Sequence, residues 1–159
     1  MGLIADEVGI IKFKGTFDLQ GMLRMMHAYI VDRGYDFFET THKAKVPELE
    51  LKWKGEKKVT PYERYDIKLE FHFYDLKQIE VDGRKMTEGR FTIVFDGDVK
   101  RDFQGVWDTK KSKVQAKLKT FYETVTKKEW MVKHAGTLIG EVAELRDKTN
   151  SYLGMVAAY

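Results

Sequence analysis

Hydrophobic and polar residues alternate strictly along the stretch "YDIKLEFHFY", residues 65–74. Successive side chains of a strand point to opposite faces of a sheet, so the alternation predicts a strand with one apolar and one solvated face. Glu70 and His72 lie side by side on the polar face, which is either a reactive site or simply the solvated side of the sheet. The apolar positions are Tyr65, Ile67, Leu69, Phe71 and Phe73.

Shorter alternations and turn residues predict the rest of a sheet. The sequence "VDGR", residues 81–84, contains Asp-Gly, a strong signal for a two-residue hairpin. "DGD", residues 96–98, predicts another turn. Consecutive strands joined by short turns indicate an antiparallel meander of about five strands. The expected strands cover residues 8–15, 36–41, 48–54, 65–81, 90–95 and 99–107.

Two helical regions complete the pattern. The first follows Asp18, a suitable N-cap, and ends before Gly34, a suitable C′ residue. The second begins near residue 109. An unbroken helix over 109–159 would span about 75 Å, whereas a ten-residue strand covers about 33 Å. We therefore expect this helix either to break, near 126–129 or Gly136, or to project beyond the sheet.

This order predicts a single α+β domain over residues 1–159. Residues 1–108 supply an antiparallel sheet and one early helix, and 109–159 form a C-terminal helical segment that packs on the sheet and can project from it. A curved antiparallel sheet that grips a long C-terminal helix resembles the helix-grip architecture in outline. The resemblance is one of topology alone.

Composition narrows the cellular setting. The chain carries a formal net charge of +3 and has no cysteine, two serines and one asparagine. Scarce Asn and Cys with abundant Lys and Glu is the bias of heat-adapted proteins. The N-terminal "MGLIADEVG" lacks the basic region and long apolar stretch of a targeting signal, and no apolar run approaches the roughly 20 residues that cross a bilayer. We expect a cytoplasmic protein without a membrane partner.

The usual marks of catalysis are missing from the sequence. Ser112 and Ser151 lie outside any Gly-x-Ser-x-Gly elbow, and neither a dinucleotide nor a Walker motif occurs. The four histidines are far apart in sequence, and we interpret Glu70 and His72 as solvated cross-strand partners. The sequence therefore predicts a protein that is not an enzyme and has no cofactor, metal site or catalytic residue.

The leading functional hypothesis is a protein-interaction or assembly module. From Met131 to Tyr159 apolar residues recur at alternating spacings of four and three, a heptad pattern that favours helix pairing. Additional apolar positions, such as Ile139, suit packing on a sheet instead. The chain would associate with itself or with a partner helix. The predicted interface residues are Leu138, Val142, Leu145, Tyr152 and Val156.

Two other hypotheses stay open. In the first, the helix covers the aromatic sheet face imperfectly and leaves a pocket for a hydrophobic small molecule, lined by Met26, Phe71, Phe73, Phe91 and Phe95. In the second, the chain binds nucleic acid, because residues 100–133 hold ten Lys or Arg against four Asp or Glu. The predicted contacts for nucleic acid are Lys110, Lys111, Lys113, Lys117 and Lys119.

Overall fold

A computed structural model describes residues 2–101, 113–130 and 134–157. Five strands form one antiparallel sheet in the order β1-β5-β4-β3-β2. The α+β class predicted from the sequence is confirmed, with an antiparallel sheet and a long C-terminal helix packed on it. The strands are β1 (Gly2–Phe17), β2 (Asp36–Lys45), β3 (Glu48–Lys58), β4 (Glu63–Val81) and β5 (Arg84–Arg101).

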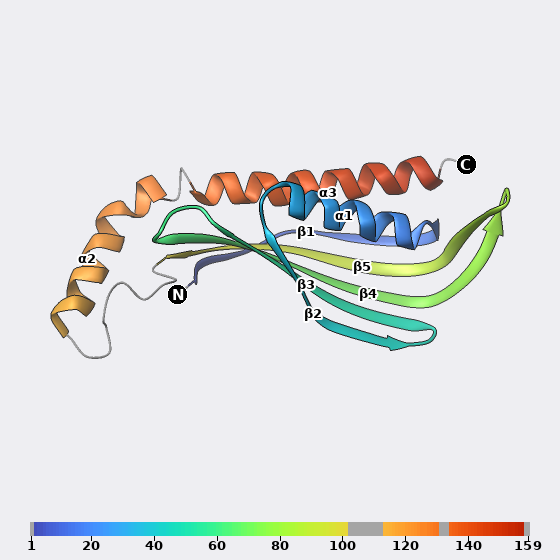
Figure 1. The fold of residues 1–159 in the computed structure, drawn as a ribbon, viewed down its shortest axis with the longest axis horizontal. Coiled ribbons are helices and arrows are strands. Elements are labelled where there is room, and N and C mark those ends of the chain that lie inside the picture. Colours follow the sequence, from blue (N-terminus) through green and yellow to red (C-terminus); the bar gives the residue numbers. More distant parts are fainter. Residues whose placement is uncertain (1, 102–112, 131–133, 158–159) are drawn as a thin grey trace.

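Three helices accompany the sheet. Helix α1 (Leu19–Asp32) connects β1 at one edge of the sheet with β2 at the other edge. Helix α3 (Gly136–Ala157) lies beside α1 on the same face of the sheet, as Figure 1 shows. Helix α2 (Lys113–Trp130) lies beyond the end of the sheet and projects away from it (Figure 1). The predicted C-terminal helical region thus contains two helices, α2 and α3, and α2 projects from the sheet (Figure 1).

Local sequence signals produce the expected ends and turns. Asp18 caps α1, since its Oδ1 accepts a 3.0 Å hydrogen bond from the backbone N–H of Gly21. Gly34 follows the helix with φ of 89°, the left-handed conformation of a C′ glycine. Asp82 and Gly83 also have positive φ, 52° and 77°, as a tight hairpin turn with both central residues left-handed requires.

The turn predicted at residues 96–98 is wrong, because these residues lie inside β5. The expected strands 90–95 and 99–107 are one strand as far as Arg101, and residues 102–107 are outside the described part of the chain. Gly97 has a packing role here. A Cβ at this position would lie 3.2 Å from Cγ of Leu138, so glycine lets α3 approach the sheet closely.

The core fills the space between the sheet and the two helices α1 and α3. The five odd-numbered apolar residues of β4, from Tyr65 to Phe73, are at most 3% exposed. Phe17, at the end of β1, is fully buried and packs edge-on against Phe91 with ring centroids 4.8 Å apart. The apolar face of β4 is thus covered by α1 and α3.

Candidate functional site

Helix α2 carries a row of apolar side chains that its own chain leaves exposed. Val114 is 66% exposed, Leu118 48%, Phe121 68% and Val125 65%. We call these four residues the α2 stripe. Their spacing of four, three and four residues places them on one side of the helix. Because α1 and α3 already cover the sheet face, the stripe does not join the core that the described residues form.

Arg101, the last residue of β5, anchors α2 to the sheet through residues beside the stripe on the helix surface. Its guanidinium is 1% exposed and donates hydrogen bonds to the carbonyl of Glu123, at 3.2 Å, and to Oγ1 of Thr126, at 2.6 Å. It also lies over the rings of Tyr62 and Tyr122, 5.4 Å from each centroid. Arg101 thus holds α2 at a defined place while the stripe faces solvent.

A buried polar chain fixes the start of α3 next to this anchor. His134 Nδ1 and the Tyr65 hydroxyl are 2.9 Å apart, and His134 Nε2 is 2.6 Å from Oε2 of Glu63. Glu63 also lies near the Arg101 guanidinium, with Oε1 3.9 Å from Nε. A neutral imidazole that accepts from the tyrosine and donates to the carboxylate satisfies both contacts. The chain links the α3 start, β4 and the α2 anchor.

The Tyr65–His134–Glu63 chain resembles the connectivity of a catalytic relay, but all three residues are at most 9% exposed. Tyr65 is 3% exposed, and burial raises the pKa of its hydroxyl, which opposes formation of a nucleophilic phenolate. Neither of the two hollows described below is lined by these residues. We therefore interpret the chain as a structural junction.

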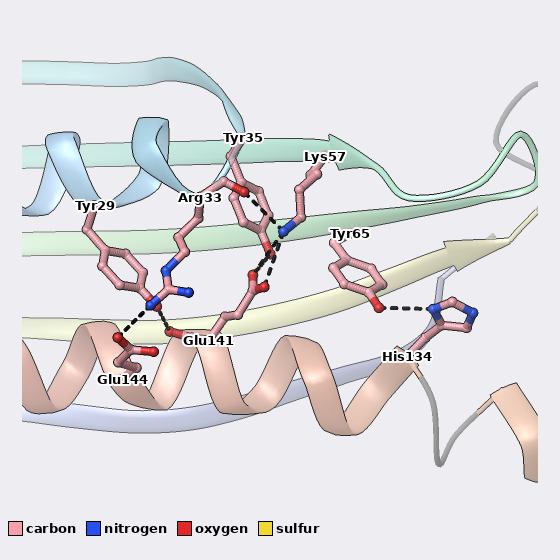
Figure 2. A network of polar contacts seen from close by, with 8 residues as sticks. All are labelled: Tyr29, Arg33, Tyr35, Lys57, Tyr65, His134, Glu141 and Glu144. Carbon is pink, nitrogen blue, oxygen red and sulfur yellow. Dashed lines mark hydrogen bonds and ion pairs between the residues drawn. The ribbon is translucent and has the colours of Figure 1, made fainter.

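Further along α3, Glu141 forms a polar clamp on the sheet (Figure 2). The Tyr35 hydroxyl donates a 2.5 Å hydrogen bond to Oε2 of Glu141, and Lys57 Nζ lies 3.2 Å from Oε1. The Tyr29 hydroxyl donates to the Glu141 carbonyl at 2.8 Å. Burial and the nearby Glu141 carboxylate raise the pKa of Tyr35, and burial raises that of Tyr29 to about 12. Both tyrosines thus remain neutral donors that hold α3 in place.

The predicted interface residues lie mainly inside the monomer. Leu138, Val142 and Leu145 are 0–2% exposed and belong to the core. Tyr152 is half-buried, and its hydroxyl donates to Oδ2 of Asp18 at 3.1 Å. The side chain of Val156 is outside the described part of the structure. The heptad pattern of α3 therefore serves packing on its own sheet.

The residues predicted for an apolar pocket and for nucleic-acid binding lie in different parts of the structure. The side chains proposed for an apolar pocket, Met26, Phe71, Phe73, Phe91 and Phe95, are 0–2% exposed and lie together in the core. Of the lysines proposed for nucleic acid, Lys113 and Lys117 are exposed on α2 and Lys119 is half-buried. Lys110 and Lys111 lie outside the described residues.

Glu70 and His72 lie on the outer face of the sheet. The strand register pairs Glu70 with Lys52 and His72 with Glu50, so both are members of ordinary cross-strand pairs. Among the described residues, no group of three His, Cys, Asp or Glu side chains is arranged to hold a metal ion. Glu70 and His72 therefore lie in the pattern expected of a solvated sheet face.

The same face contains two buried carboxylates that the sequence pattern did not reveal. Asp66 and Asp98 are directly opposite each other on β4 and β5. Asp66 is fully buried and accepts two hydrogen bonds from Arg64, at 2.8 and 3.1 Å. Asp98 is 8% exposed, and its Oδ1 lacks a hydrogen-bond partner in the described structure. Burial and the nearby Asp66 raise the pKa of Asp98.

The described residues line surface hollows that include the following two. One, of about 590 Å³, lies between α1 and α3 and is lined by residues that include Met25, Gly140 and Tyr152. The other, of about 270 Å³, lies on the outer sheet face between Lys12, Tyr74 and Arg90. Neither is enclosed by convergent buried polar groups of the kind that fix a small ligand.

Comparison with known proteins adds no further constraint. No protein-family model matches the chain, and no curated protein is similar to it in sequence. Within the described ranges, none of the helices is long and apolar enough to span a bilayer. The α2 stripe is the candidate functional site, because it combines exposed apolar side chains with a fixed position on the fold.

Proposed function

We propose that this protein is a non-enzymatic interaction module that binds a partner protein helix along the α2 stripe. The observation that supports the proposal is the exposure of all four stripe residues, which ranges from 48% to 68%. Monomeric proteins rarely expose contiguous apolar patches, and those that do commonly use them as interaction sites.

The spacing of the stripe favours a helix as the occupant. Val114, Leu118, Phe121 and Val125 follow the alternating four- and three-residue intervals of a helix-pairing seam. Complete burial of a Val, Leu or Phe side chain contributes about 1.5–3 kcal/mol, so four partly exposed side chains retain several kcal/mol of unused burial. A second helix laid along α2 would recover that burial.

This proposal keeps the type of function predicted from the sequence but changes its location. Association was expected through α3, whose apolar residues Leu138, Val142 and Leu145 are occupied by the sheet. The surface available for association is on α2, and Arg101 and Thr126 hold that helix in its projecting position. The sheet with α1 and α3 would then be a rigid scaffold that holds α2 in position.

Site-specific photo-crosslinking tests the proposal. A photoreactive phenylalanine analogue replaces Leu118 in one variant and Thr120 in the other, about 200° around the helix axis from Leu118. Each variant is irradiated in lysate of the source cells, and adducts are mapped by mass spectrometry. We expect a discrete adduct on an amphipathic helical segment from position 118, reduced by Phe121→Ala, and little from position 120. Equal adducts from both positions would contradict the proposal.

A further inference from the structure

The lysines around the α2 stripe indicate what kind of helix it takes. Lys113 and Lys117 are exposed and stand four residues apart, so they are neighbours on one flank of the stripe. Over its whole length α2 has five lysines against two glutamates. One of these glutamates, Glu123, accepts a 3.1 Å hydrogen bond from the Tyr62 hydroxyl on the anchored side. The flank next to the stripe is therefore positively charged.

These charges are unfavourable for α2 by itself. The first turn has no acidic residue, and a lysine stands at the N-terminus, where the helix dipole is already positive. Like charges four residues apart, as in Lys113 and Lys117, also destabilise a helix by a few tenths of a kcal/mol. This end of α2 is the one farthest from the sheet (Figure 1). A partner that brings carboxylates to it would relieve both costs.

We propose that the partner of α2 is an acidic amphipathic helix from another protein, with carboxylates placed against Lys113 and Lys117. This inference rests on the proposed function and adds the chemistry of the partner. Charge complementarity supports it, because apolar contacts along the stripe would be accompanied by opposite charges on its flank. A second copy of α2 would instead bring another excess of lysines, which disfavours pairing between two copies of this helix.

The test uses three designed helical peptides of about 20 residues that share one apolar seam. Their flanking positions are all Glu, all Gln or all Lys, and their affinities for the full-length protein are measured by calorimetry. We expect the Glu peptide to bind at least about tenfold more tightly than the Gln peptide at about 50 mM salt, and this ratio to shrink at about 500 mM. The Lys peptide should bind most weakly.

Charge reversal on the protein supplies the matched comparison. The K113E/K117E variant should prefer the Lys peptide to the Glu peptide. A control, K43E/K45E, makes the same change in net charge at exposed positions on β2, whose hairpin with β3 lies far from α2 (Figure 1). The control should keep the preference of the wild-type protein for the Glu peptide.

The outcomes separate this inference from the proposed function. Equal affinity for the Glu and Gln peptides would overturn the acidic partner but leave a helix-binding stripe intact. Failure of all three peptides would contradict both. Two other results would also overturn the acidic partner: an α2-dependent dimer that excludes the peptides, and binding of a single-stranded RNA that depends on Lys113 and Lys117 when the Glu peptide does not bind.

Discussion

The guanidinium of Arg101, at the end of β5, donates a 2.6 Å hydrogen bond to Oγ1 of Thr126 in α2. A second hydrogen bond from the same group reaches the carbonyl of Glu123 at 3.2 Å. These contacts attach α2, whose apolar stripe is exposed, to the sheet, whose apolar face is already covered. This buried arginine, together with the Tyr62 hydroxyl that donates a 3.1 Å hydrogen bond to Glu123, holds the candidate interaction surface in position.

Arg101→Lys should loosen α2 without unfolding the sheet. Lysine keeps the positive charge near Glu63, but its ammonium cannot reach both acceptors in α2 or replace the guanidinium over the rings of Tyr62 and Tyr122. Amide hydrogen exchange should show at least about tenfold faster exchange in 113–126 and unchanged protection in β4. Unchanged protection of α2 would show that Arg101 is not its anchor.

Tyr35→Phe should weaken the clamp that holds α3. The substitution removes the hydroxyl that donates to Glu141 and leaves the ring in the core. Because hydrogen bonds to charged groups contribute about 1.5–3 kcal/mol, we expect a loss of this size in the free energy of unfolding measured with urea. A double-mutant cycle with Lys57→Met should show coupling, since both side chains contact the same carboxylate. Strict additivity would contradict a shared clamp.

Asp98→Asn should stabilise the protein at neutral pH. The pKa of Asp98 is raised in the folded state, so the folded protein binds a proton more tightly than the unfolded chain. Stability should then fall as the pH rises from the ordinary aspartate pKa of 3.8 through the raised value. Removing the charge of a buried carboxylate whose Oδ1 lacks a hydrogen-bond partner in the described structure should add about 1 kcal/mol at pH 7, and the difference between variant and wild type should vanish near pH 3.

Glu56→Gln, on β3 and two strands away from Asp98, is the control with the opposite sign. The hydrogen bond from Lys54 and the nearby Arg64 charge lower the pKa of Glu56. Its contribution to stability is present above the ordinary glutamate pKa and disappears as the pH falls through the lowered value. Glu56→Gln should therefore destabilise the protein at pH 7 and have little effect in acid. The same sign for both variants would contradict the pKa directions.

The sequence predicted the fold class because its strand alternation and helix caps are local signals. The error at residues 96–98 has a tertiary cause, since Gly97 is required by Leu138 of α3 and not by a turn. Periodicity located the apolar row of residues 131–159 but could not show that the sheet would cover it. The His134–Tyr65 contact joins residues 69 positions apart, and no local spacing reveals such a partner.

We propose that the α2 stripe is a binding surface for a partner, whereas the apolar residues of α3 belong to the core. Urea unfolding of Leu118→Ala/Phe121→Ala tests this proposal, and Leu138→Ala/Leu145→Ala, which truncates two buried leucines of α3, is the control. Alanine preserves helix propensity in both. The control should lose at least about 4 kcal/mol, since each buried Leu→Ala change costs about 2–5 kcal/mol. We expect the free energy of unfolding of the stripe variant to stay within about 1 kcal/mol of the wild-type value. A loss as large as that of the control would contradict it, because the stripe would then be part of the protein's own core.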